Sequence, residues 1–267
     1  MSAPRTSDRR TRRDAVLTAR GIVNRFGKEE VHAGINLDIM RGEILGIAGG
    51  SGSGKSVLLK TLVGLHRPNA GTVLLNDKAI DAIGNAERAS LIGVLFQQGA
   101  LFSSLSVAQN VMLPLREHTD LSAHDQERIA AMKLELAGMP AEAGIKFPAE
   151  LSGGMVKRAA FARALALDPQ ILFLDEPTSD LDPITAGGID AMIRQLNDGL
   201  GVTVVVVTHD LTTLFTLCDR VAILVNHKIT VDTLPHLLHD DEPWIREFLH
   251  GPRAEGARAA RRKIHGN

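Results

Sequence analysis

The segment from Gly49 to Ser56, GGSGSGKS, has the residue types and the spacing of a phosphate-binding loop. Its glycines allow successive backbone N–H groups to turn toward one polyphosphate, and the start of the following helix adds positive charge. Lys55 would contact the β- and γ-phosphates of a nucleotide, and the Ser56 hydroxyl would bind Mg²⁺. A flexible glycine-serine loop is the alternative, but it does not account for the strand and helix patterns on either side. The expected nucleotide-binding residues are Gly49, Gly50, Ser51, Gly52, Ser53, Gly54, Lys55, Ser56 and Val57.

An acidic pair, Asp175 and Glu176, follows the apolar run ILFL. Asp175 is placed to hold Mg²⁺ through water, and Glu176 to orient and deprotonate the water that attacks the terminal phosphate. The alternative is that the pair caps the next turn, because the segment EPTSDLD is rich in turn residues. A phosphate-binding loop in the same chain favours the catalytic role.

A histidine, His209, follows another apolar run, VVVVT. A single histidine after a strand is more often structural than catalytic. Here the strand would end at the carboxyl edge of the sheet, where the phosphate-binding loop also lies and where ligands bind. We therefore expect His209 to contact the γ-phosphate.

A second helix start that could hold an anion lies in ELSGGMVKRAAFAR, from Glu150 to Arg163. Ser152 would cap a helix beginning at Gly153, and the two glycines leave the helix start open to an anion. One chain needs only one phosphate cradle, so the second would serve the nucleotide of another copy in a twofold dimer. The alternative is an ordinary serine cap with small residues for helix packing.

Short apolar runs alternate with helical patterns, which predicts an α/β fold with an open, mostly parallel sheet. Buried parallel strands are expected at 43–48 and in the runs SLIGVLFQQ, ILFLDEP, VTVVVVTHD and RVAILV, and a helix is expected over 55–65. The stretch from about Gln98 to Ala149 lacks such runs and predicts a helical insertion between two strands. The segment LPHLLHDDEPWIREFLHG predicts a short helical tail.

The composition narrows the function classes. The net charge of -1 gives no indication of a nucleic-acid-binding protein, and the single cysteine, Cys218, fits a reducing compartment. No secretory signal is recognisable, and no apolar run approaches the roughly 18 residues that a membrane-spanning helix needs. Both ends of the chain are basic and polar, which favours solvated tails over the alternative of contact with an anionic membrane surface.

In order along the chain, these motifs resemble those of the ATP-binding subunit of an ABC transporter, over about residues 15–234. The motifs are Walker A at Gly49–Ser56, the Q-loop at Gln97, the signature LSGGM at Leu151, Ser152, Gly153, Gly154 and Met155, Walker B ending at Glu176, the D-loop SDLD with Asp182, and the switch His209. The resemblance implies ATP and Mg²⁺, with catalytic roles for Glu176, His209 and Gln97 and metal ligation by Ser56, Gln97 and Asp175.

The resemblance also implies a P-loop NTPase (RecA-like) core with a mostly parallel sheet, an antiparallel β subdomain and an inserted helical subdomain. The expected division is a basic tail at 1–14, a nucleotide-binding core at 15–97 and 165–235, a helical signature subdomain at 98–164, and a C-terminal helix with a basic tail at 236–267. ATP would then bring two copies together head to tail, each signature completing the site of the other copy.

Two positions depart from the usual family pattern. Phe26 stands where the family has an aromatic residue, usually tyrosine, that stacks on adenine; phenylalanine keeps the stacking face, and packing in the core is the alternative. Met155 replaces the usual signature glutamine, which puts one polar contact in doubt but leaves the backbone N–H groups available.

The segments VLFQQGALFSSLSVAQNVMLPLREHT and ELSGGMVKRAAFARALALDP are similar to the ATPase of the Mla/MCE phospholipid-transport systems. This likeness implies an MlaE-like membrane permease, an MlaD-like MCE-domain protein and an MlaB-like STAS-domain protein as partners. It implies a peripheral location on the cytoplasmic face of the inner membrane. An ABC ATPase for another substrate, a soluble non-transport ABC ATPase and a degenerate nucleotide-binding module are the alternatives; the presence of Lys55, Asp175, Glu176 and His209 argues against the last.

Two segments are expected to contact partner proteins. Leu101, Phe102 and Leu105, behind the Q-loop, are candidates for a hydrophobic groove that faces the permease, with the core of the insertion as the alternative. The segment from Asp241 to Gly251 would serve assembly, and the surface it packs on is its own domain, the other ATPase copy or the STAS-like partner.

Overall fold

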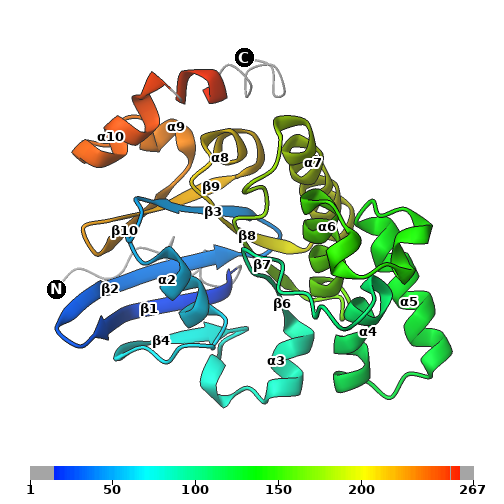
Figure 1. The fold of residues 1–267 in the computed structure, drawn as a ribbon. Coiled ribbons are helices and arrows are strands. Elements are labelled where there is room, and N and C mark those ends of the chain that lie inside the picture. Colours follow the sequence, from blue (N-terminus) through cyan, green and yellow to red (C-terminus); the bar gives the residue numbers. More distant parts are fainter. Residues whose placement is uncertain (1–14, 253, 259–267) are drawn as a thin grey trace. The chain divides into compact units, whose positions relative to one another are not determined.

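The computed structural model describes residues 15–252 and 254–258 (Figure 1). The chain divides into two compact units. The first unit combines residues 1–83 with 209–267, and the second spans 84–208. The predicted fold class is confirmed, because the structure is α/β with one antiparallel sheet and one mostly parallel sheet. The compact units follow other boundaries than the domain division expected above, which remains a prediction. The basic segments 1–14 and 259–267 lie outside the described residues. Residues 254–258 belong to the C-terminal tail that was expected to be solvated, but they are helical, with Ala254 and Ala257 buried and the Arg258 guanidinium donating to the Leu249 carbonyl oxygen at 2.6 Å.

An antiparallel sheet in the first unit has the strand order β2-β1-β4-β5. Its strands are β1 (Ala15–Phe26), β2 (Glu29–Met40), β4 (Ala70–Leu75) and β5 (Lys78–Ala79). Leu17 pairs with Ile39 and Ala19 with Leu37, so apolar residues of both long strands share the buried face. The short 3-10 turn Ile80–Ala82 ends this part of the unit.

Three further strands of the first unit position the phosphate-binding loop: β3 (Ile44–Gly49), β9 (Arg220–Val225) and β10 (Lys228–Asp232). β3 runs parallel to β9, β10 runs antiparallel to β9, and all six residues of β3 are buried. The helices of this unit are α2 (Lys55–Leu62), α8 (Leu211–Leu217), α9 (Leu234–Leu237) and α10 (Pro243–His250).

Helix α2 is shorter than the sequence pattern predicts. It ends at Leu62 instead of Leu65, because Gly64 adopts a left-handed φ of 75° that a helix cannot continue. Leu65 is then exposed. The apolar spacing alone did not show this stop.

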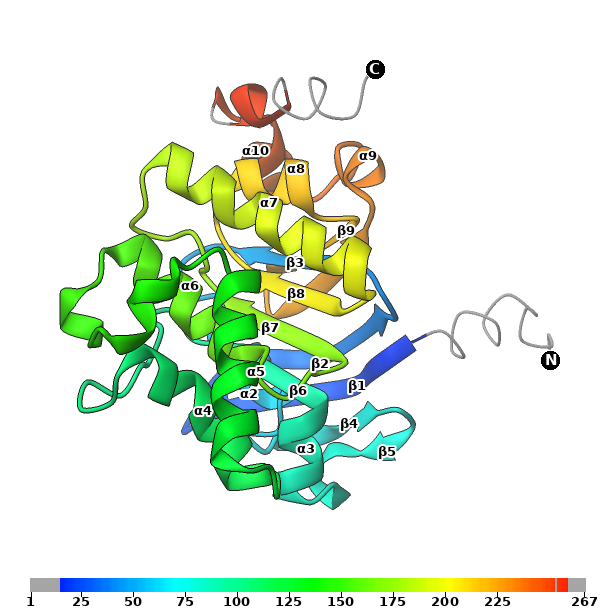
Figure 2. The ribbon, with the colours of Figure 1, turned by 90° about the vertical axis from the view of Figure 1, so that its right-hand side faces the viewer.

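The second unit contains three parallel strands, β6 (Ile92–Leu95), β7 (Ile171–Asp175) and β8 (Thr203–Val207), in the order β8-β7-β6. Its helices are α3 (Asn85–Leu91), α4 (Val107–His118), α5 (Ala123–Leu136), α6 (Gly153–Ala164) and α7 (Pro183–Leu200), with 3-10 turns at Ala141–Ile145 and Pro148–Glu150. Helices α4, α5 and α6 pack on one another (Figure 2). Residues 96–170 are all described and contain no strand, so the predicted helical insertion between two strands is confirmed.

The parallel strands of the second unit place several predicted site residues at one edge. Leu95 of β6 pairs with Leu174 of β7, and Asp175 pairs with Val207 of β8. The residues that follow these strands, Gln97, Glu176 and Thr208, therefore leave the sheet at the same carboxyl edge. Across the described part of the chain, every helix is too short or too polar to cross a membrane.

Candidate nucleotide-binding and catalytic site

The phosphate-binding loop follows β3 in the first unit, and its geometry depends on glycine. A side chain on Gly49 would come within 2.6 Å of the Leu224 carbonyl oxygen, and Gly54, which precedes α2, has a left-handed φ of 94°. Lys55 Nζ donates to the carbonyl oxygens of Gly49, at 2.8 Å, and Gly50, at 2.9 Å. The lysine side chain thus folds back along the loop, where its ammonium group lies against the backbone that would surround a phosphate.

A buried polar network lies behind this loop, and sequence analysis missed it. Asn24 Nδ2 donates to His32 Nδ1 at 2.9 Å and to Thr61 Oγ1 at 3.0 Å, and Thr61 Oγ1 donates to the Val57 carbonyl oxygen at 2.8 Å. Because Asn24 donates to Nδ1, the neutral imidazole carries its proton on Nε2, which lies 2.7 Å from where a Gly54 side chain would begin. The only signal in the sequence is the place of Asn24, two residues after Ile22 on the inward face of β1.

Burial lowers the pKa of His32 to about 4, and the nearby His227 and His66 add to this effect. We expect the protein to lose stability in acid. Below pH 6.5 His32 binds a proton in the unfolded chain, whereas in the folded chain it binds one only near pH 4. Between pH 7 and pH 4 this residue should lower the free energy of unfolding by about 3 kcal/mol. Urea unfolding at several pH values measures the effect.

The control for this prediction is the pH slope of two variants. His32→Leu and His32→Asn both remove the titrating group, so both should show a flatter dependence of unfolding free energy on pH than the wild type. The two variants should share this slope even where their stabilities at pH 7 differ. A wild-type slope in both variants would contradict the assignment.

Phe26 is the last residue of β1 and has 49% of its surface exposed. Its ring stacks on His66, with ring centroids 5.3 Å apart and an angle of 23° between the planes. Core packing, the alternative considered above, does not fit a ring that is half exposed. Stacking of Phe26 on adenine remains a prediction.

The acidic pair lies at the end of β7 in the second unit, and both residues are 8% exposed. Glu176 adopts a left-handed φ of 49°, and its N–H donates to the Val207 carbonyl oxygen at 2.8 Å. Thr208 Oγ1 donates to Glu176 Oε2 at 3.3 Å. A non-glycine residue at positive φ is uncommon, and the surrounding hydrogen bonds hold this one in place.

Lys157, on the signature helix α6, is a residue that sequence analysis missed. The residue is only 8% exposed, and its Nζ donates to the carbonyl oxygens of Gln97 and of Glu176, the latter at 3.0 Å, and to Ser179 Oγ at 3.3 Å. Burial lowers the pKa of Lys157, against the opposing charges of nearby acidic groups. One ammonium group therefore links the Q-loop, the backbone of the expected base and the segment leading to Asp182.

The segment after Gln97 is held by two further side chains. Arg163 of α6 donates to the carbonyl oxygens of Ala100, at 2.6 Å, and Gly99, at 2.9 Å. Asn110 of α4 is fully buried; its Oδ1 accepts from the Phe102 N–H at 2.7 Å, and its Nδ2 donates to the Phe102 carbonyl oxygen at 3.1 Å. Gln97 is itself exposed on a turn after β6.

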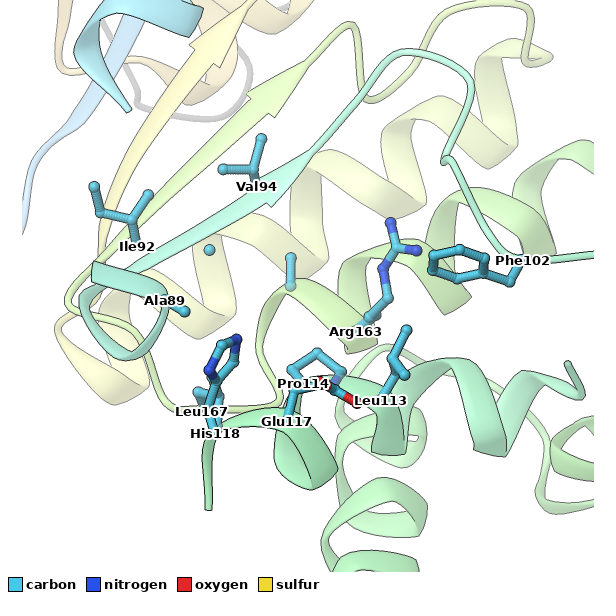
Figure 3. Close-up of a pocket in the computed structure, with 12 residues that line it drawn as sticks. Ala89, Ile92, Val94, Phe102, Leu113, Pro114, Glu117, His118, Arg163 and Leu167 are labelled. Carbon is cyan, nitrogen blue, oxygen red and sulfur yellow. The ribbon is translucent and has the colours of Figure 1, made fainter. Parts of the chain in front are cut away.

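Phe102 and Arg163 of this region line a pocket of about 360 Å³ in the second unit (Figure 3). Phe102, 54% exposed, and Arg163 lie side by side at one end, with Leu113 and Pro114 of α4 below them and Val94 and Ile92 of β6 farther along. Leu101 and Leu105 are half-buried and do not line the pocket. Of the three apolar residues singled out in the sequence, Phe102 alone lines it.

The signature segment begins α6 as the sequence predicts. Ser152 is the N-cap of the helix, and its hydroxyl accepts from the Met155 N–H at 3.4 Å. Ser152 and Gly153 are exposed, whereas Gly154 is buried, and a side chain on Gly154 would come within 2.6 Å of Thr185 Cγ2. The exposed helix start agrees with an anion site supplied to another molecule, and that role stays a prediction.

Asp182 and His209 lie at the starts of helices. Asp182 is the N-cap of α7: its carboxylate accepts from the N–H groups of Ile184 and Thr185, both at 3.0 Å, and from Thr185 Oγ1 at 2.6 Å. The Thr185 hydroxyl and N–H lower the pKa of Asp182. His209 is exposed and belongs to the first unit, two residues before α8.

Comparison with known proteins confirms the resemblance stated from the sequence. The chain is 40% identical over 241 residues to the probable ribonucleotide transport ATP-binding protein mkl of Mycobacterium leprae, covering 89% of this chain and 69% of that one. It is 37% identical over 240 residues to the intermembrane phospholipid transport system ATP-binding protein MlaF of Haemophilus influenzae, covering 88% and 90%. Identity to MlaF of Escherichia coli K12 is 40% over 229 residues, covering 84% and 85%.

Solved structures agree with these relatives. A dimeric, post-hydrolysis structure of the ATP-binding cassette MJ0796 bound to ADP and phosphate has a TM-score of 0.76 at 31% identity, covering 82% of this chain and 98% of that one. cbiO1 of Clostridium perfringens, part of an ABC transporter complex, has a TM-score of 0.76 at 29% identity, covering 91% and 98%. The family model described as ABC transporter matches residues 32–179, more than half of the chain. The chain therefore belongs to the family of ABC transporter ATP-binding proteins.

Proposed function

We propose that this chain hydrolyses ATP to drive phospholipid transport through an integral membrane permease. The observation that carries the proposal is the 37–40% identity to MlaF over most of both chains. A phosphate-binding loop and a nearly buried glutamate at a strand end supply the groups that ATP hydrolysis requires. The Asn110 side chain holds the backbone of Phe102 through two hydrogen bonds, and this supports docking of the permease at the pocket behind the Q-loop.

The predicted phosphate-binding, metal-binding and catalytic residues each have a role in this scheme. The loop N–H groups and Lys55 bind the phosphates, Phe26 stacks on adenine, and Glu176 deprotonates the attacking water, while His209 contacts the γ-phosphate. Ser56, Gln97 and Asp175 would hold Mg²⁺, and their hydroxyl, amide and carboxylate oxygens are the hard donors that this ion prefers. When bound, Mg²⁺ neutralises charge that develops on the phosphates.

The proposed assembly contains two copies of the chain. Ser152 to Gly154 of each copy would bind the γ-phosphate held by the other, as the exposed start of α6 and the dimeric state of the solved cassette support. An MlaE-like permease, an MlaD-like MCE-domain protein and an MlaB-like STAS-domain protein would complete the complex. The chain would then lie on the cytoplasmic face of the inner membrane.

A second candidate is ribonucleotide transport, because the identity to the mkl protein of Mycobacterium leprae is also 40%. A pull-down of the tagged chain from detergent-solubilised membranes, with identification of bound small molecules, separates the two. Phospholipid in a complex with a polytopic membrane protein supports the first proposal, and ribonucleotide held by that membrane protein supports the second. Recovery of the chain from the aqueous fraction alone would favour a non-transport ABC ATPase.

Phe102→Glu should abolish recovery of the permease in this pull-down, while the isolated subunit stays folded. The side chain at position 102 is exposed, so a carboxylate there costs little in the free subunit. When an apolar permease segment docks, the carboxylate would be buried without an opposite charge or hydrogen-bond donor. The measurement is the amount of permease recovered per tagged chain, at matched expression.

Leu136→Glu is the matched control for this variant. Leu136 is also an exposed apolar residue of the second unit, at the end of α5, but it does not line the pocket. The control should retain the permease. Unchanged recovery with Phe102→Glu and loss with Leu136→Glu would place the permease interface on α5 instead.

A further inference from the structure

The C-terminal helix α10 packs on the first unit, which answers a question the sequence left open. Ile245 and Leu249 are fully buried, and α10 lies against β9 (Figure 1). The Glu242 carboxylate caps the helix at the Ile245 N–H, at 3.0 Å, and accepts from Asn226 Nδ2, in the turn after β9, at 3.2 Å. The chain's own residues therefore cover Ile245 and Leu249, whereas Trp244 and Phe248 of the same apolar face are half-buried.

Trp244, on this helix, lies beside the phosphate-binding loop. A side chain on Gly50 would begin 3.6 Å from Trp244 Cζ2 and 3.8 Å from Nε1, which is ordinary van der Waals distance from the indole edge. The indole stacks on Phe248, with ring centroids 4.8 Å apart and planes 17° from parallel. The carbonyl oxygen of Gly50 accepts from Lys55 Nζ, so Trp244 lies beside the residue that holds the lysine expected to bind phosphate.

We propose that Trp244 is a positioning residue for nucleotide binding, which braces Gly50 of the phosphate-binding loop and couples α10 to the state of the site. The inference rests on the proposed nucleotide function of this loop. It assigns the C-terminal helix a role at the ATP site in addition to the assembly role expected from the sequence.

The physical reason is preorganisation. A loop with glycines at Gly49, Gly50, Gly52 and Gly54 samples many backbone conformations when nothing restrains it, and ordering it around phosphate costs entropy. A rigid aromatic ring beside Gly50 restricts the space that the loop can sample before the nucleotide arrives, so less entropy is lost on binding. The stack on Phe248 and the buried anchors Ile245 and Leu249 hold the ring in place.

Intrinsic fluorescence tests whether Trp244 senses the site, because it is the only tryptophan of the chain. Titration of the full-length wild type with MgADP should change the indole emission, with a midpoint equal to the dissociation constant from equilibrium dialysis of labelled ADP. Lys55→Ala should require a much higher MgADP concentration for the same change.

Substitution tests the effect on binding. Trp244→Ala should weaken MgADP about tenfold, because it removes the brace but leaves the buried anchors. Trp244→Phe should retain most of the affinity, since a ring remains on the helix. Arg246→Ala, at an exposed position of the same helix, should bind as the wild type does. Thermal unfolding shows whether each variant is folded.

The outcomes distinguish a failure of the Trp244 proposal from a failure of the proposed nucleotide function. Wild-type affinity in folded Trp244→Ala, or an unchanged wild-type emission at saturating MgADP, would overturn the inference while the nucleotide site stands. If Trp244→Ala fails to fold, the emission titration of the wild type decides alone. Failure of the wild type to bind labelled nucleotide would overturn both proposals.

Discussion

Glu176→Gln should leave ATP bound but almost unhydrolysed. The glutamine has nearly the same shape and stays in the same place, because the backbone of residue 176 is held by the Val207 carbonyl and by Lys157. It cannot accept a proton from water, and loss of a general base lowers turnover by about 10²–10⁴-fold. Turnover of purified protein and ATP affinity, measured separately, check the prediction.

Lys55→Ala is the contrasting variant in the same experiment. Each charge-assisted hydrogen bond from the ammonium group to phosphate contributes about 1.5–3 kcal/mol, so its loss should weaken ATP binding as well as hydrolysis. The pair of variants therefore separates the group that binds from the group that reacts. Near-normal turnover in Glu176→Gln would remove this residue as the base.

Mixed dimers should regain activity that each crippled homodimer lacks. One copy carries Lys55→Ala and the other Gly153→Asp, which puts a negative charge at the exposed start of α6. If each site combines the phosphate-binding loop of one copy with the signature of the other, the mixture contains one site with both defects and one intact site. Homodimers of either variant should be inactive, and the mixture should recover up to about half of the turnover per heterodimer, since one of two sites is restored.

The controls for this experiment concern composition and the signature residue. Met155→Gln should have little effect, because backbone N–H groups bind the anion and the side chain is not needed for that contact. The heterodimer content of the mixture is measured with two different affinity tags. No recovery in proven heterodimers would mean that the sites are not shared or that both must act together, and activity of a strictly monomeric preparation would refute the shared site.

Elements that depend on local sequence were predictable. Gly49 to Ser56 marks the phosphate-binding loop because its glycines, lysine and serine are neighbours in the chain, and Ser152 marks the start of α6 by the local chemistry of a helix cap. The apolar run before Asp175 likewise indicates a buried strand, which the structure contains as β7. The helical character of the insertion followed from the absence of such runs.

Contacts between distant residues were decided by the tertiary structure. Lys157 lies 60 residues from Gln97, and nothing in the local pattern distinguishes it from the exposed Lys60 of α2 until folding buries its ammonium group. His32 is one polar residue in a strand until Asn24, on the paired strand, determines its tautomer.

The C-terminal helix also combines an element that the sequence predicts with contacts that only the tertiary structure decides. Its amphipathic spacing was readable from PWIREFL, and the structure confirms a helix there, but a short amphipathic helix does not specify the surface that covers it. Packing of Ile245 and Leu249 on the first unit brings Trp244 to Gly50, at the other end of the sequence. The sequence alone determined the family, the motifs and the buried strands that precede them, because these depend on neighbouring residues. The tertiary structure decided which side chains support them, because burial and hydrogen bonding depend on residues far apart in the chain.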